Sequence, residues 1–140
     1  MMRVIILMLS LSGLSTAAFA HGEDVPGPNG GFVRMPGAFH TEVIPVSRNK
    51  LKVYLLDIQW KNPSVKNSNL SVTFKGKKSS TAKCVVEADY YICDFANDID
   101  LKKKGKLTVD AERENQKGDV VSYDLPLKLQ VVDDGHGSHH

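Results

Sequence analysis

Histidine is the residue type in this chain whose positions could support chemistry. The five histidines lie at three places, which are His21, His40 and the C-terminal group His136, His139 and His140. Neutral imidazole is the commonest side-chain ligand of transition metals in proteins. A nitrogen-rich ligand set favours Cu(II) or Zn(II) over Mg²⁺ or Ca²⁺. Metal binding, most plausibly of copper and otherwise of zinc or another divalent transition metal, is therefore the first hypothesis.

The residues before His21 give this histidine particular weight. Residues 1–3 carry a positive charge, residues 4–14 form an apolar run, and residues 18–20 form a small-x-small cleavage site. This is the layout of a secretory signal peptide, and the apolar run is too short to span a bilayer as a helix. Cleavage after Ala20 would make His21 the N-terminus, where its α-amine and imidazole can chelate one metal ion together. We expect an exported, periplasmic protein.

Three further residues could complete such a site with His21. His40 and Glu42 are separated by one residue, so on a strand their side chains point to the same face. Met35 offers a soft thioether suited to Cu(I). Each has a plainer interpretation, because a His-x-Glu pair can be a solvated strand face and Met35 can simply pack beside Pro36. The tail histidines form a loose chelating cluster, and an expression-tag remnant could also end in this way.

No pattern in the sequence supports catalysis. There is no Gly-x-Ser-x-Gly, no His-Glu-x-x-His and no phosphate-binding glycine loop,. An N-terminal histidine does bind copper in some oxidative enzymes, and His40 could supply the second imidazole that they need. The remaining carboxylates have no partner that the sequence identifies; they include Asp57, Asp94, Asp98 and Asp100. We therefore expect a binding protein with no catalytic residues.

The charge balance bears on the partners of the chain. It has 18 basic and 16 acidic residues with a formal net charge of +2, which argues against nucleic acid as a partner. The short basic runs 75–78 and 102–104 are interpreted as solvated loops. No second long apolar segment is present, so no membrane span is expected after signal cleavage.

Hydrophobic periodicity predicts an all-β domain over residues 39–132. A glycine- and proline-rich opening over 21–38 is expected to be flexible, and the tail 133–140 is expected to be disordered. Alternating apolar residues predict seven strands, which span 39–46, 51–60, 70–74, 81–87, 90–95, 106–112 and 120–131. This pattern favours an immunoglobulin-like antiparallel β-sandwich, with a small closed barrel as the alternative. Pro126 suggests an edge position or a bulge in the last strand.

The two cysteines fit a hairpin disulfide. If Ala88 and Asp89 form the tip of a hairpin, Cys84 faces Cys93 as a non-hydrogen-bonded pair, at a separation that a disulfide can bridge. A four-residue loop keeps the same facing pair, so the turn length stays open. A redox-active or metal-binding dithiol is the alternative, but eight intervening residues are far from Cys-x-x-Cys.

A short segment of the chain resembles a known group of proteins. The residues that carry the resemblance are Gly27-Pro28-Asn29-Gly30-Gly31, Gly37-Ala38-Phe39-His40-Thr41-Glu42-Val43 and Leu51-Lys52-Val53-Tyr54-Leu55-Leu56-Asp57. They are similar to small periplasmic Gly-Pro-His-Gly-Gly…His-x-Glu-Leu domains found with RND-type heavy-metal efflux adaptors. The resemblance implies an immunoglobulin-like sandwich that handles copper, zinc or cobalt, with an efflux component as partner. Asn29 stands where those domains usually carry histidine, which weakens the implied metal site.

Two functions from different classes follow from these observations. The leading hypothesis is a periplasmic copper-binding chaperone, or accessory to a heavy-metal resistance system, that uses His21, His40 and either Glu42 or Met35. The alternative is a cell-envelope interaction module that docks a partner by strand addition and binds no metal. A copper oxygenase-like enzyme is a third and weaker candidate.

Overall fold

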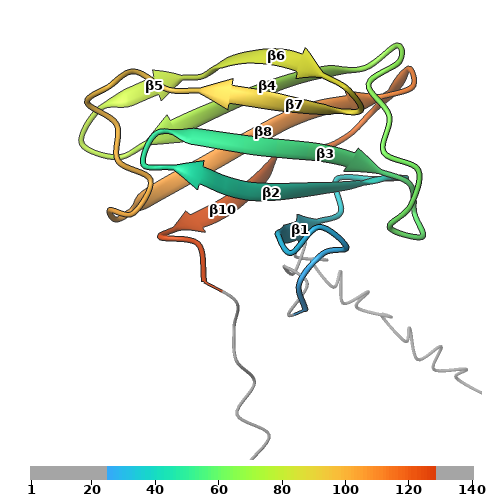
Figure 1. Cartoon of the computed structure of the whole chain (residues 1–140), viewed down its shortest axis with the longest axis horizontal. Coiled ribbons are helices and arrows are strands. Elements are labelled where there is room, and N and C mark those ends of the chain that lie inside the picture. Colours follow the sequence, from blue (N-terminus) through green and yellow to red (C-terminus); the bar gives the residue numbers. More distant parts are fainter. Residues whose placement is uncertain (1–24, 129–140) are drawn as a thin grey trace, which may run out of the picture.

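The computed structural model describes residues 25–128 and contains only β-strands within that range (Figure 1). The all-β prediction is therefore confirmed for the described part of the chain. The ten strands are β1 (Phe32–Arg34), β2 (His40–Ser47), β3 (Lys50–Leu56), β4 (Asn69–Lys75), β5 (Ser79–Thr81), β6 (Lys83–Glu87), β7 (Tyr90–Asp94), β8 (Gly105–Arg113), β9 (Gln116–Lys117) and β10 (Val121–Leu125).

The strands form two antiparallel sheets that pack face to face. One sheet has the order β1-β2-β3-β7-β6, and the other has the order β10-β8-β4-β5 with β9 paired to β8. Alternate residues of the central strands point inward and are buried, as expected for a strand with one solvated face. The core between the layers includes Phe39, Val43, Leu51, Val53, Leu55, Val72, Leu107, Val109 and Tyr123.

The strand boundaries differ from the sequence prediction where local hydrogen bonds end a strand early. The predicted run 51–60 stops at Leu56, because Asp57 begins a turn in which its amide bonds to the carbonyl of Lys61. The predicted run 81–87 starts in β5 of one sheet and continues as β6 of the other. β10 ends at Leu125, immediately before Pro126, which has no amide hydrogen for a further ladder bond,. Residues 32–34 of the glycine-rich opening pair with β2 as β1.

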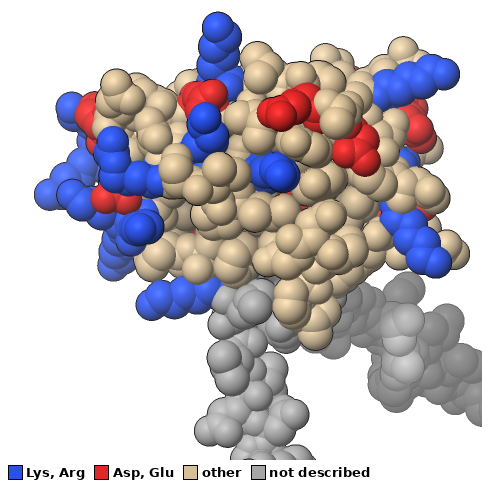
Figure 2. All heavy atoms as spheres, viewed as in Figure 1, with Lys and Arg blue, Asp and Glu red and all other residues tan. Residues whose placement is uncertain are grey.

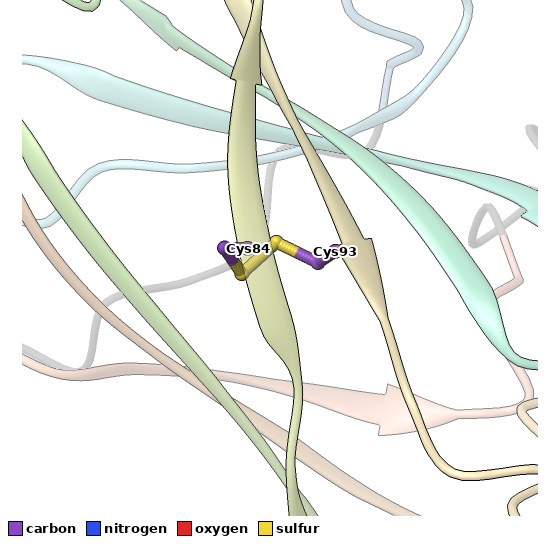
Figure 3. The surroundings of a disulfide bond; sticks show 2 residues. All are labelled: Cys84 and Cys93. Atoms are coloured by element: carbon purple, nitrogen blue, oxygen red, sulfur yellow. A yellow bond between two sulfur atoms is a disulfide. The ribbon is translucent and has the colours of Figure 1, made fainter.

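The disulfide prediction is confirmed. Cys84 and Cys93 are bonded and lie opposite each other in the β6–β7 hairpin, with a Cα–Cα distance of 4.0 Å (Figure 3). The register pairs Glu87 with Tyr90, so the turn consists of the two residues between them. Ala88 has a φ of 53° there, a left-handed conformation of the kind that tight hairpin turns require.

The two sheets are linked to each other along both of their edges. On one side, β5 leads directly into β6 through Ala82, whose amide bonds to the Val72 carbonyl at 2.9 Å. On the other side, Arg34 of β1 donates to the Ser122 carbonyl of β10 at 3.0 Å and lies over the Tyr123 ring at 4.5 Å. Since β1 and β10 belong to different sheets, this arginine joins their edges. No helix capable of crossing a membrane occurs within residues 25–128.

Two buried tyrosines in the core differ in their hydrogen bonding. The Tyr123 hydroxyl donates to the Thr41 carbonyl at 3.1 Å and lies 2.8 Å from the Thr41 hydroxyl. Burial raises the pKa of Tyr123 well above its usual range,. The Tyr91 hydroxyl is also buried but has no hydrogen-bond partner within residues 25–128. A buried hydroxyl without a partner costs free energy, whereas a bonded one stabilises the fold.

We expect Tyr123→Phe and Tyr91→Phe to change stability in different ways. The first removes a bonded hydroxyl and leaves the Thr41 hydroxyl without this partner, so the free energy of unfolding should fall by about 1–2 kcal/mol. The second removes an unpaired hydroxyl from the core, so stability should stay the same or rise. Urea unfolding of both variants measures this, and equal losses in the two would contradict the assignment.

Candidate functional site

The structure places three of the predicted ligands and leaves the others outside the described residues. His40 and Glu42 lie on β2, and both are almost completely buried, at 3% and 0% exposure. Met35 follows β1 and is exposed. His21 and the tail histidines His136, His139 and His140 fall outside residues 25–128. The question for the described site is therefore what His40 and Glu42 contact.

Glu42 binds the glycine-rich turn that precedes β1. Its carboxylate accepts hydrogen bonds from the backbone amide of Asn29 at 2.8 Å, the side-chain amide of Asn29 at 2.9 Å and the backbone amide of Gly31 at 3.0 Å. Hydrogen bonds from backbone amides to a carboxylate are among the stronger ones in proteins. Glu42 thus fastens the opening segment onto the outer face of β2.

The glycines of this turn are required by their close approach to β2. A Cβ atom on Gly31 would lie 2.7 Å from the Val43 carbonyl oxygen and 2.6 Å from the Ile44 side chain. A Cβ atom on Gly27 would overlap the Glu42 carboxylate. Gly30 has a φ of 77°, a left-handed conformation that glycine adopts without strain,. The Gly-Pro-Asn-Gly-Gly segment therefore acts in this chain as a clasp over Glu42.

Glu42→Ala should destabilise the protein far more than Asn29→Ala. Removal of the carboxylate leaves the three donors without an acceptor, two of them backbone amides, and should lower the free energy of unfolding by about 3 kcal/mol. Asn29→Ala removes one side-chain donor at an exposed residue and should cost about 1 kcal/mol. Urea unfolding followed by the fluorescence of Trp60 measures both, and similar losses would show that the clasp is not held by the carboxylate.

His40 is held by the loop that follows β3. Its Nδ1 lies 3.0 Å from the carbonyl oxygen of Asp57, and its Nε2 accepts a hydrogen bond from the Trp60 indole at 3.1 Å. The indole nitrogen can only donate, so Nε2 must be the acceptor and Nδ1 carries the proton. The Trp60 ring also packs edge-on against the imidazole, with 5.6 Å between the ring centroids. Both nitrogens are thus occupied, and neither has a lone pair free for a metal.

The Asp57 carboxylate holds this loop in place through hydrogen bonds to the residues on both sides of Trp60. Its Oδ1 accepts from the amides of Gln59 and Lys61, both at 2.9 Å, and its Oδ2 accepts from the Asn62 side chain at 2.8 Å. These hydrogen bonds lower the pKa of Asp57 below its usual value, and the bond from the Lys61 amide has the largest effect,. Trp60 takes a φ of 65° in the turn. The strained backbone at Trp60 is therefore supported by the carboxylate that the turn surrounds.

Arg113 of β8 ties the same loop to the other sheet. Its side chain is largely buried. It donates to the Leu55 carbonyl at 3.2 Å and to the Asn62 carbonyl at 2.6 Å, and it pairs with Glu114 at 3.2 Å. A buried guanidinium needs such acceptors, because an unpaired charge in the interior is costly. The loop around His40 is thereby fixed at both ends.

These contacts give His40 and Glu42 structural partners on two separate segments. Within residues 25–128, no group of three or more histidine, cysteine, aspartate or glutamate side chains is arranged to hold a metal ion. The sequence prediction that His40 and Glu42 share a face fits their positions on β2, but each is covered by a different segment. The sequence did not indicate the roles of four residues that matter here: Trp60 and Arg113 were not singled out, Asn29 was noted only as a replacement for a histidine, and Asp57 was set aside as a carboxylate without a partner.

We expect His40→Ala to lower stability and leave metal affinity within about twofold of the parent. The substitution leaves the Trp60 indole and the Asp57 carbonyl unpaired, at a cost of about 1–2 kcal/mol. Thermal unfolding and a copper titration of the same variant test this together. A loss of copper affinity of tenfold or more at unchanged stability would instead make His40 a ligand.

The chain matches no protein-family model, no curated protein and no solved structure. The function must therefore be argued from the residues and their geometry.

Proposed function

We propose that this protein is an exported, periplasmic copper-binding protein that serves as a chaperone or accessory in a heavy-metal efflux or resistance system. The ligands in this proposal are the α-amine and imidazole of His21 and the imidazoles of the tail. His40 and Glu42 serve as structural residues, because their polar atoms are already engaged.

The observation that carries the proposal is that β1 and β10, the first and last strands of the fold, are neighbouring sheet edges. Both ends leave the fold on the side formed by β1 and β10 (Figure 1), whose edges are joined by the bond from Arg34 to Ser122. His21 lies six positions before the clasped Gly27, a reach of at most about 22 Å, and His136 lies eight positions after Lys128, a reach of at most about 29 Å. We propose that the two histidine-bearing segments share one ion.

In this proposal the clasp at Glu42 positions the segment that carries His21. By fastening Asn29 and Gly31 to β2, it fixes the position from which the His21 segment departs. A short tether to a rigid layer raises the effective concentration of one ligand near another. Copper would then bind in a chelate assembled from both segments. Exposed Met35, which lies directly after β1, is a further ligand available for Cu(I).

We also infer that the two-layer structure is of immunoglobulin-like type. The sheet orders β2-β3-β7-β6 and β10-β8-β4-β5 correspond to strands A-B-E-D and G-F-C-C′ of such folds. The disulfide joins β6 to β7, strands D and E in this correspondence, in place of the B–F pair of antibody domains. This fold class agrees with the resemblance to domains of heavy-metal efflux adaptors, and that resemblance is the reason for proposing an efflux component as partner.

Isothermal titration with copper and zinc tests the proposal directly. The protein is secreted with its own signal and shown by mass to start at His21, and its comparator carries four additional alanines before His21. We expect one-to-one copper binding that weakens at least tenfold in the comparator, because the extension removes the terminal amine from the chelate. Affinity should also fall as the pH drops below about 6.5, since protons compete for imidazole.

A variant with His136, His139 and His140 changed to alanine isolates the contribution of the tail. Weakening in both this variant and the extended comparator would establish a shared site. Weakening only in the comparator would place the site at the N-terminus alone. If the parent itself binds copper no more tightly than millimolar, the proposed function is wrong.

A second candidate function is suggested by β6. This strand is the edge of its sheet, and Val85 and Val86 on it are 46% and 56% exposed. An apolar edge strand with unpaired backbone groups is suited to strand addition by a partner. If a partner is recovered from envelope extract in the presence of chelator, and is lost when Val86 is changed to lysine, the interaction module would replace metal binding as the function.

A further inference from the structure

The lysines of this domain are concentrated at one end of the two-layer structure. Residues 75–78 and 98–106, which are distant in sequence, meet where the β4–β5 turn lies beside the β7–β8 loop (Figure 1). Together they contain seven exposed lysines, which are Lys75, Lys77, Lys78, Lys102, Lys103, Lys104 and Lys106. We call this group the lysine end. It is visible as the dense blue cluster at the left of Figure 2.

Packing contacts hold the two segments together. They line a common hollow of about 370 Å³, whose lining includes Phe74 and Ile99 as well as four of the lysines. Gly105 sits so close to the Phe74 ring and the Lys75 carbonyl that a Cβ atom there would lie 2.8 Å and 3.1 Å from them. Lys75 and Lys106 of the lysine end therefore lie on the ends of β4 and β8, and the other five lysines lie in the turn and the loop that meet around this hollow.

The charge at this end is concentrated and only partly compensated. The two segments carry seven lysines and two aspartates, a net charge of +5, whereas the other described residues carry ten basic and ten acidic side chains. Asp98 pairs with Lys78 at 3.2 Å, and Asp100 accepts the backbone amide of Lys102 at 3.0 Å. The entire net charge of the described domain thus resides at the lysine end.

One strand pair shows that this concentration opposes stability. Lys75 of β4 lies directly opposite Lys106 of β8 in the register. Like charges directly opposite each other across a ladder are destabilising. A lysine pair in this position raises the local positive potential at a cost to the fold, as a surface built to meet a negative partner would do.

The chemistry of the lysine end indicates what kind of partner it fits. The basic side chains of the two segments are all lysines, which act as point charges and lack the bidentate geometry of arginine. Arg48 lies beside them and donates to the Ile99 carbonyl at 3.2 Å. The large exposed apolar residues of the described chain, which include Val46, Ile58, Val85, Val86 and Val120, all lie outside the two segments, and of these five Val46 lines a hollow together with Lys102. Protein interfaces usually depend on aromatic or arginine anchors, whereas clustered lysines suffice for attraction to a negatively charged bilayer.

We propose that the lysine end docks the protein on the surface of an anionic phospholipid bilayer. The phosphate-bearing headgroups supply a diffuse negative surface, and the lysines approach it without any apolar side chain being inserted. Binding of this kind is reversible and falls as ionic strength rises, because exposed charges are screened over about 10 Å at 0.1 M salt.

Vesicle flotation of the full secreted chain in EDTA tests this inference separately from metal binding. The probes are vesicles of phosphatidylcholine alone and vesicles with 30% phosphatidylglycerol. The variant Lys103→Glu/Lys104→Glu is compared with Lys61→Glu/Lys66→Glu, which makes the same change in net charge at the exposed β3–β4 connection on the opposite end of the molecule (Figure 1). We expect the parent and the control to bind the anionic vesicles and the lysine-end variant to bind at least about tenfold less.

Several outcomes would overturn the proposal. Equal losses in the two variants would show a response to net charge alone, with no docking surface. Equal binding to both vesicle types would remove the role of the headgroup charge. If the parent fails to bind anionic vesicles but binds polyglutamate through Lys103 and Lys104, the lysine end is a site for an acidic protein and not for lipid. Unchanged circular dichroism and thermal unfolding verify that both variants are folded.

Discussion

The buried carboxylate of Glu42 is the constraint on which the arrangement of the N-terminal half depends. A carboxylate at 0% exposure is tolerated only with donors around it,, and here two backbone amides and the Asn29 side chain supply them. Those amides belong to a turn whose glycines alone allow the chain to come so close to β2. The turn in turn leads into β1, from which Arg34 reaches across to β10. One acidic residue thus connects the opening segment, the first sheet and the edge of the second.

The sequence predicted the parts of the fold that follow from alternation and from local register. The period of two along β4, β8 and β10 marks an apolar face, and counting outward from Ala88 and Asp89 places Cys84 opposite Cys93. Strand ends were harder to predict, because they are decided by side chains whose hydrogen bonds take the place of those between neighbouring strands. The turn at Asp57 ends β3, although the apolar character of the chain continues through Ile58 to Trp60. The switch of one predicted strand between the two sheets at Ala82 depends on tertiary packing and leaves no local signal.

Tertiary packing also limited what the sequence could predict about the roles of His40 and Glu42. Their spacing correctly indicates a shared face of a strand, but spacing carries no information about what covers that face. The covering groups come from Asn29, which precedes β2 in sequence, and from Trp60, which follows β3. A histidine with an indole on one nitrogen and a carbonyl oxygen on the other is a packed and bonded core residue. The pattern Asp-x-Gln-x-Lys after a strand was the one local clue, since an aspartate that caps the following amides is typical of such turns.

The C-terminal end of β10 and the lysine end are neighbours in the fold. Leu125 pairs with Gly105 in the register, and Pro126 and Leu127 line one hollow with Leu101 and Lys102. The clasp, in contrast, holds the opening segment over the middle of β2, against Val43 and Ile44. A cation and a lysine cluster repel each other, so a metal ion held close to those lysines would be bound more weakly because of their charge. Of the two groups of ligands in the proposed metal site, the chelate at His21 therefore starts from the better position, because its segment begins at the clasp and the tail begins beside the lysines.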